Sequence, residues 1–207
     1  MMRIACFIVV LLLSCGENQQ PAQQKQPATV APVTKPVVVL QPLQRFDTST
    51  LPALADSIAA FYPVTVQIAP LKTLPEHIYY KPRNRYRADR IIHWLRLNMA
   101  DSLRVVVGLT SLDISSSRKG NYDYGIMGLG YNPGHACVVS SFRPAKTARN
   151  KSHLQQRVFK LVVHELGHNF GLPHCPDPAC IMRDAEGKMT LDEESGLCEA
   201  CKKKLKI

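Results

Sequence analysis

The spacing of three histidines constrains this chain more than any other feature. His164 and His168 are four residues apart, so a helix would place both imidazoles on one face, about 6 Å from each other. Gly171 tolerates the positive φ that ends a helix, and Pro173 prevents the helix from resuming. The chain can therefore fold back and present His174 as a third ligand of one Zn²⁺, with the fourth tetrahedral position left for water.

Glu165 follows the first histidine directly, where its carboxylate can take a proton from zinc-bound water. Zinc lowers the pKa of that water toward neutrality and polarises a carbonyl, and the carboxylate can pass the proton to a leaving amine. These residue types predict metal-dependent hydrolysis of peptide bonds with Glu165 as general base. The alternative is a surface helix with chance histidines. Background residue frequencies give that motif in roughly one 200-residue chain in a few hundred, and Gly171 and His174 lower the frequency by about three orders of magnitude.

Four cysteines form a second group that overlaps the first. Cys175 and Cys180 are separated by four residues, and Cys198 and Cys201 form a Cys-x-x-Cys near the chain end. Two short pairs of thiolates suit a closed, structural zinc site. Two disulfides are the competing interpretation, but a Cys-x-x-Cys is an awkward short loop for cross-links and a ready metal clip. Because His174 and Cys175 are neighbours, we expect their side chains to point to opposite sides, each toward its own metal.

The N-terminus is typical of a signal peptide. Arg3 precedes an apolar run at 4–13 that is too short to span a bilayer, which predicts a signal peptide over residues 1–14. The sequence Leu-Leu-Ser-Cys-Gly at 12–16 resembles a bacterial lipoprotein signal, which implies that Cys15 is lipidated and begins the mature chain. The alternative is a buried N-terminal strand or helix.

Residues 15–44 are rich in proline and glutamine and show no periodic apolar face, so we expect a disordered tether. Only the short run 37–40 is apolar enough to pack on something. A lipid anchor and a tether would hold the folded domain at a membrane surface, which predicts a location in the cell envelope, on the periplasmic side or at the cell surface.

The formal net charge of +10 raises the question of nucleic-acid binding. The basic residues are distributed along the chain: Arg83, Arg85, Arg87, Arg90, Lys146, Arg149, Lys151, Lys202, Lys203, Lys204 and Lys206. Basic and aromatic residues do not alternate as they do in proteins that bind single strands. We therefore interpret most of this charge as solvated surface, with attraction to acidic partners as the alternative, and expect no nucleic-acid partner.

The remaining residues, 45–207, are long enough for one domain with a sizeable core. Apolar spacing predicts helices at 51–62, 86–100 and 152–169 and strands at 62–69, 103–109 and 135–142. Residues 110–133 are rich in Gly, Ser, Asn and Asp, which predicts a long irregular loop with at most a short strand at 125–129. The mixed order predicts an α+β fold, with a twisted mixed sheet over the histidine-bearing helix and a small C-terminal subdomain clipped by zinc.

The combined pattern resembles the archaemetzincins, zinc metallopeptidases of the metzincin clan. The resemblance rests on these residues: His164-Glu-x-x-His168-x-x-Gly171-x-x-His174-Cys175, Cys180, Met182, Cys198-x-x-Cys201 and, upstream, Thr110-x-x-Asp113, Gly125 and the segment 136–143. It covers most of residues 103–201. It implies a metzincin-like zincin fold, a catalytic zinc on the three histidines, Glu165 as general base, Met182 in a turn beneath that zinc, and a second zinc on the four cysteines.

The sequence also departs from the family pattern. The interval from Met182 to Cys198 is slightly shorter than in the family, which implies a trimmed loop. Arg183 follows the methionine, so no tyrosine there can help to stabilise an oxyanion. Tyr122, Tyr124 and His135 are substitute candidates, although each is more simply a loop residue. By analogy with the clan, residues 135–142 would form the edge strand that pairs with an extended substrate. Cys137 on that strand is interpreted as a small buried apolar residue.

The function expected from these features is a monomeric zinc metallopeptidase with two Zn²⁺ that acts on peptides or proteins. One alternative is a non-catalytic zinc-binding envelope lipoprotein, which would keep every ligand but would not need Glu165. Another is a basic nucleic-acid binder with a zinc ribbon made by the cysteines, which leaves the three histidines unexplained.

Overall fold

The computed structural model describes residues 35–98, 105–205 and 207. The predicted signal peptide, Cys15 and most of the predicted tether lie outside the described residues. Within the described part of the chain, no helix has both the length and the apolar character needed to cross a membrane.

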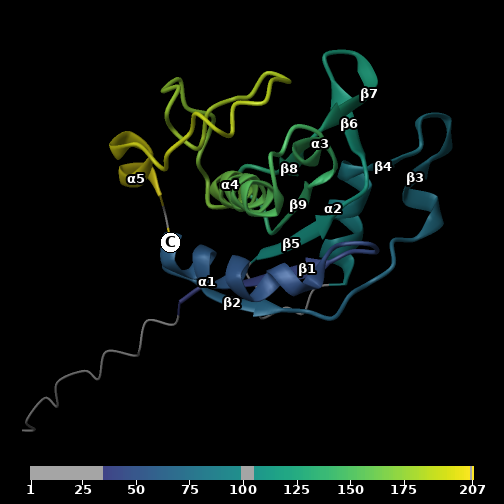
Figure 1. Ribbon diagram of the computed structural model, residues 1–207, viewed down its shortest axis with the longest axis horizontal. Helices are drawn as coiled ribbons and strands as arrows, with labels where there is room; N and C mark the ends of the chain where they lie inside the picture. Colours follow the sequence, from purple (N-terminus) through teal and green to yellow (C-terminus); the bar gives the residue numbers. More distant parts are fainter. Residues whose placement is uncertain (1–34, 99–104, 206) are drawn as a thin grey trace, which may run out of the picture. The chain divides into compact units, whose positions relative to one another are not determined.

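A five-stranded mixed sheet, in the order β2-β1-β5-β9-β8, forms the centre of the domain (Figure 1). β1 (Val37–Pro42), β2 (Thr65–Ile68), β5 (Val105–Thr110) and β9 (Ala136–Ser140) run parallel, and β8 (Gly128–Gly130) pairs antiparallel with β9. β5 is buried along its whole length, as expected of a parallel strand that is covered on both faces. The strand predicted at 135–142 is therefore confirmed as β9, but it is not the edge strand, because β8 lies outside it.

β1 corrects the expected boundary of the tether. This strand pairs with β2 on one side and β5 on the other, and Val38 and Leu40 are completely buried. The prediction of a disordered tether is therefore wrong for residues 37–44, which belong to the folded domain. The apolar run at 37–40 was the only local sign. The prolines and glutamines around this run favoured a tether. The strand partners that make it a strand lie far away in the sequence, so no local pattern indicated them.

Helices cover both faces of the sheet and contribute one apolar cluster on each side. α1 (Leu51–Phe61) and α4 (Lys151–Asn169) pack on one face, and α2 (Ala88–Leu97) packs on the other. The predicted helices at 51–62 and 152–169 are confirmed, and the helix predicted at 86–100 begins two residues later. Asn150 caps α4, because its side chain accepts a hydrogen bond from the backbone N–H of His153 at 2.9 Å.

The segment predicted as a long irregular loop at 110–133 is largely strand. It contributes β6 (Ile114–Arg118) and β7 (Asn121–Ile126) to a second sheet, in which β3 (Tyr79–Tyr80) and β4 (Arg85–Arg87) complete the order β3-β4-β6-β7. Lys119 and Gly120 both have positive φ and form the tight turn between β6 and β7. The loop prediction failed because these strands are short and polar, and their pairing rather than their composition makes them strands.

Short helical elements complete the domain. They are η1 (Thr48–Thr50), η2 (Glu76–Ile78), η3 (Lys81–Arg83), α3 (Phe142–Ala145) and α5 (Glu199–Lys204). α5 follows a long segment that crosses beside α4 and leads to the C-terminal cysteines (Figure 1). The α+β fold with a mixed sheet, a histidine-bearing helix and a C-terminal cysteine cluster is thus confirmed.

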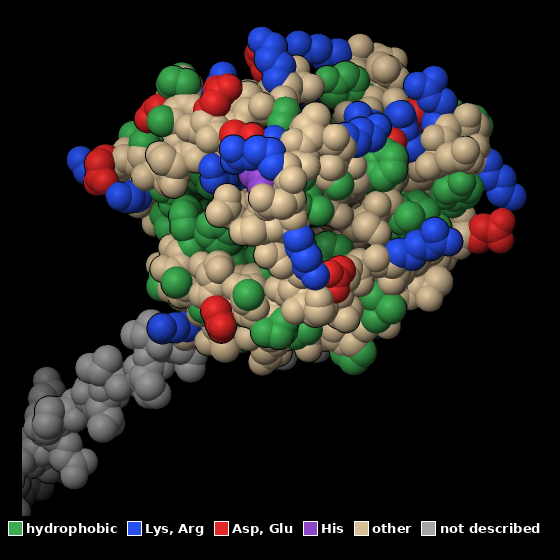
Figure 2. Space-filling model, in the orientation of Figure 1, with side chains coloured by type: hydrophobic (Ala, Val, Ile, Leu, Met, Phe, Trp, Pro, Cys, Tyr) green, Lys and Arg blue, Asp and Glu red, His purple; other side chains and the backbone are tan. Residues whose placement is uncertain are grey.

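One of the arginines assigned to solvated surface is in fact buried. Arg87 is only 1% exposed; its guanidinium lies 4.0 Å from the ring centre of Tyr122, and its Nε donates to Asp89 at 3.0 Å. It therefore cross-links β4 to β7 instead of facing water. On the face drawn in Figure 2, the other Lys and Arg side chains are spread out and mixed with acidic ones.

Candidate metal centre

Three imidazoles meet where α4 ends. His164 and His168 project from α4, and Gly171, with φ of +92°, turns the chain so that His174 returns to them. One nitrogen from each ring lies within 4.8 Å of the others, and the Nε2 atoms of His168 and His174 are 3.2 Å apart. Three imidazole nitrogens that converge in this way fit the ligand set of a single zinc ion.

The opposite ring nitrogens are held by other groups. Nδ1 of His164 donates to the carbonyl of Ile181 at 2.6 Å, and Nδ1 of His168 donates to the carbonyl of Leu172 at 2.8 Å. Each donation fixes the tautomer that leaves Nε2 free for a metal. Burial lowers the pKa of His164 to about 4 and also lowers the pKa of His168, so both rings are neutral near pH 7, the form that binds zinc.

Glu165 lies beside these histidines and against the edge strand of the sheet. Glu165 is only 6% exposed, and a Cβ atom added to Gly128 would overlap its carboxylate. A Cβ on Gly130 would come within 2.7 Å of its backbone oxygen. β8 can therefore approach Glu165 this closely only because positions 128 and 130 are glycines. Burial raises the pKa of Glu165 to about 8, and a hydrogen bond from the backbone of Gly130 opposes that rise. The site holds a carboxylate with unusually high proton affinity.

Met182 packs against α4 at the level of the histidines. It is completely buried, and a Cβ on Gly167 would overlap its sulfur. The carbonyl of Met182 accepts from the backbone N–H of Cys175 at 2.8 Å, and the preceding carbonyl, of Ile181, holds His164. The methionine turn thus connects the histidine group to the cysteines.

The four predicted cysteines converge on one point. Their sulfur atoms lie within 4.8 Å of one another, with 3.7 Å between Cys175 and Cys198 and 3.8 Å between Cys180 and Cys201. All four are free thiols, at separations far from the roughly 2.05 Å of a disulfide. A hydrogen bond from the backbone of Cys201 is the main cause that lowers the pKa of Cys198 to about 7. This arrangement fits a closed four-thiolate zinc site.

The junction between the two groups is as expected. His174 belongs to the histidine group and its neighbour Cys175 to the cysteine group. Cys137, in contrast, belongs to neither group and is completely buried in β9, as a small apolar residue would be.

A cleft of about 450 Å³ opens over the histidines and Glu165. β6, β7 and β8 line one side of it, and the segment 183–194 lines the other. A larger hollow of about 890 Å³ lies between α1 and the N-terminal half of α4, where hydrophobic side chains gather in Figure 2. None of His164, Glu165, His168 and His174 lines this hollow, so the smaller cleft is the candidate reaction site.

Two residues of this cleft that contact each other were missed by sequence reasoning. Asp184 Oδ2 lies 3.6 Å from Nδ1 of His174 and 3.3 Å from a guanidinium nitrogen of Arg118, which reaches over from the β6–β7 hairpin. Nothing in the spacing of Asp184 or Arg118 signals this contact, because it depends on the hairpin that the sequence did not reveal. Of the three substitute oxyanion candidates, only Tyr124 lines the cleft.

Comparison with known proteins identifies the family. The sequence profile of peptidase family M54 matches residues 63–207. The archaemetzincin of Methanopyrus kandleri is 36% identical over 129 residues, which are 62% of this chain and 70% of that protein. The archaemetzincin of Archaeoglobus fulgidus is 30% identical over 170 residues, 82% of this chain and 98% of that protein.

Solved structures agree with the sequence comparison. The crystal structure of the Methanopyrus kandleri archaemetzincin matches with a TM-score of 0.70 at 29% identity, covering 84% of this chain and 95% of that one. The Archaeoglobus fulgidus archaemetzincin, crystallised with malonate, matches with a TM-score of 0.69 at 27% identity, covering 82% and 99%. The resemblance inferred from the motif is confirmed. The chain belongs to peptidase family M54, the archaemetzincins, and is a zinc metallopeptidase.

Proposed function

We propose that His164, His168 and His174 hold the catalytic zinc of this peptidase and that Glu165 is the general base. The observation that carries the proposal is the convergence of three imidazole nitrogens within 4.8 Å on the floor of a cleft that also contains a buried carboxylate. The fixed tautomers of His164 and His168 support it, because each leaves Nε2 free.

The protein groups divide the work of hydrolysis. Bound zinc would supply an activated water and polarise the scissile carbonyl. Glu165 would accept the proton of that water and pass it to the leaving amine, and its burial suits the task because burial raises its proton affinity. The N–H of Gly130 would orient the carboxylate, and the outer edge of β8 offers backbone groups to which an extended peptide can pair.

We further propose that the four cysteines hold a second, structural zinc, which gives two ions per chain. Four sulfur atoms with mutual distances near those of a tetrahedral thiolate site, in a cluster of free cysteines, support this assignment.

The setting of the enzyme in the cell is proposed from its sequence. Residues 1–14 would be a lipoprotein-type signal peptide, and lipidation of Cys15 would anchor the mature chain in the cell envelope, on the periplasmic side or at the cell surface. Residues 15 to about 36 would be the tether, and the peptidase domain, which we expect to act as a monomer, would follow.

Metal depletion tests the ligand assignment. The purified protein should cleave a mixed peptide library, lose that activity to a chelator and regain it with Zn²⁺. His168→Ala should remove one of two bound zinc ions and the activity, whereas His93→Ala, an exposed histidine on α2, should change neither. Full activity of His168→Ala would refute the assignment. Two bound zinc ions without cleavage of any peptide would favour the non-catalytic zinc-binding alternative.

A further inference from the structure

One buried carboxylate of the cleft has no part in the proposed reaction. Glu194 is 3% exposed and lies on the cleft wall formed by the segment 183–194. Leu161, Met189 and Leu191 line the same cleft, together with His164. Glu194 thus shares this part of the cleft with three apolar side chains, and charged residues that include Arg183 and Lys188 line the same cleft.

The two oxygens of this carboxylate differ in their partners. Oε1 accepts a hydrogen bond from the hydroxyl of Thr190 at 2.8 Å, whereas Oε2 is buried and has no hydrogen-bond partner among the described residues. A buried carboxylate oxygen without a partner is costly, so native proteins keep few of them without a reason.

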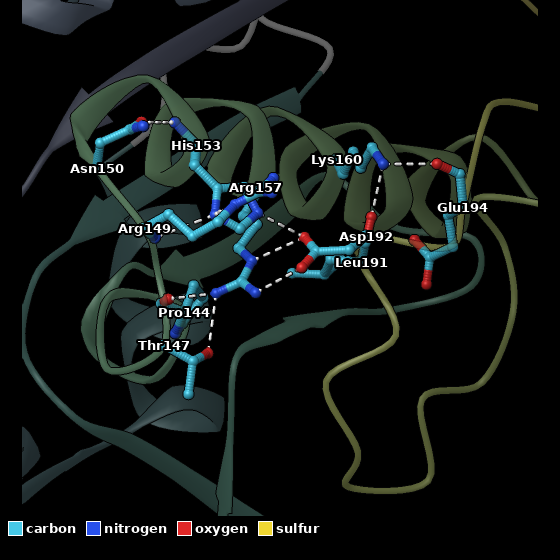
Figure 3. Close-up of polar contacts among 10 residues, drawn as sticks. All are labelled: Pro144, Thr147, Arg149, Asn150, His153, Arg157, Lys160, Leu191, Asp192 and Glu194. Carbon is cyan, nitrogen blue, oxygen red and sulfur yellow. Dashed lines mark hydrogen bonds and ion pairs between the residues drawn. The ribbon is translucent and has the colours of Figure 1, made fainter.

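The nearby cations are engaged elsewhere. Lys160 donates to the backbone carbonyls of Leu191 and Glu194, both at 2.5 Å, and the side chain of Glu194 extends away from that ammonium group (Figure 3). Arg183 pairs with the neighbouring Glu193 at 2.6 Å. Burial raises the pKa of Glu194, and the charges of Lys160 and Arg183 only partly oppose that rise.

The backbone that carries Glu194 is firmly held. Arg157 binds both oxygens of Asp192 at 2.9 and 2.7 Å, and His153 adds a third contact to Asp192 at 2.8 Å (Figure 3). Together with Lys160, these side chains tie the segment to the outer side of α4. Glu194 therefore cannot move easily toward solvent to gain hydration.

We propose that Glu194 lies in a specificity pocket beside the metal centre and selects substrates with a cationic side chain, lysine or arginine, near the scissile bond. The apolar side chains of Leu161, Met189 and Leu191 suit the methylene stem of such a residue, and the unpartnered Oε2 suits its charged end. This inference rests on the proposed function, because it takes the cleft over the histidines as the reaction site.

The wild-type enzyme provides the first test. Paired peptides would carry arginine or citrulline at each position flanking the cleaved bond, since citrulline keeps the shape of arginine without its charge. We expect kcat/KM to be higher for arginine at one position by about tenfold or more. Equal values at every position overturn this inference alone, and cleavage of neither peptide overturns the proposed function together with it.

A matched pair of variants tests the residue. Glu194→Gln keeps the shape and the contact with Thr190 but removes the charge, so it should abolish the preference for arginine and leave kcat/KM for the citrulline peptide within about threefold of wild type. Glu193→Gln, its exposed neighbour, should keep the preference. An unchanged preference in Glu194→Gln, or an equal loss in both variants, would overturn the assignment. If Glu194→Gln does not fold, the proposal is tested by the arginine and citrulline peptides with the wild-type enzyme alone.

Discussion

His174 differs from the other two histidines in what holds its second ring nitrogen. Backbone carbonyls hold His164 and His168, whereas Nδ1 of His174 faces the carboxylate of Asp184 at 3.6 Å. His174 is also the most exposed of the three rings. A carboxylate behind a ligating imidazole orients the ring and increases its basicity, so Asp184 should matter for the affinity of the site.

We therefore predict that Asp184→Asn weakens zinc binding at the histidines by about 10- to 100-fold. Competition with a chelator of known affinity measures this effect directly. Glu186→Gln removes a neighbouring exposed carboxylate and should leave the affinity unchanged. Equal affinities of Asp184→Asn and wild type would show that the contact does not support the metal.

The convergence of the proposed ligands could be predicted from sequence, because their spacing is local: a helix and one turn decide where His164, His168 and His174 lie. The same holds for the cysteine pairs. Asp184, Arg118 and Glu194 could not be predicted, because their roles depend on which segments face each other across the cleft.

At the scale of elements, the position of β8 depends on its glycines. A Cβ on Gly128 would overlap the carboxylate of Glu165. β8 can therefore lie over α4 only with glycine at this position, and the edge strand and Glu165, the proposed general base, are fixed relative to each other by direct contact.

Gly128→Ala should consequently displace Glu165 or the edge strand and lower kcat by about 100-fold, while both zinc ions stay bound. Gly196→Ala is the matched control, because a Cβ there meets nothing within 4 Å. Kinetics with one peptide, together with metal analysis, distinguishes the outcomes. Normal kcat in a folded Gly128→Ala protein would mean that this contact is not needed.

The elements differ in how well sequence predicts them. α1 and α4 were predicted within one or two residues, because their apolar faces repeat at helical spacing. β1 was assigned to a tether and β6 and β7 to a loop, since a short strand is defined by distant partners. Because β8 was also assigned to the loop, β9 was predicted as the edge strand, whereas β8 is the edge strand in the structure.

At the scale of the whole molecule, the two proposed zinc sites are joined by a short piece of backbone. His174 and Cys175 are consecutive, and Cys175 donates to the carbonyl of Met182, whose turn also holds His164. The cysteine cluster fixes the segment that returns His174 to α4. Loss of order at the cysteine site should therefore disturb the position of His174 at the histidine site.

Cys198→Ser should therefore remove the structural zinc and also lower the occupancy of the histidine site and the peptidase activity. Native mass spectrometry gives the number of bound zinc ions, and a peptide assay gives the activity. Cys137→Ala, which removes a thiol outside the cluster, should keep both ions. Loss of one zinc with full activity would show that the two sites are independent.

The most direct measurement of the central claim compares peptide hydrolysis and zinc content in wild type and Glu165→Ala. The account predicts two zinc ions in both proteins and a loss of hydrolysis in the variant of at least about 100-fold, because only the proton acceptor is removed. Glu76→Ala, an exposed glutamate in η2, should behave as wild type. Hydrolysis by Glu165→Ala at the wild-type rate would contradict the account.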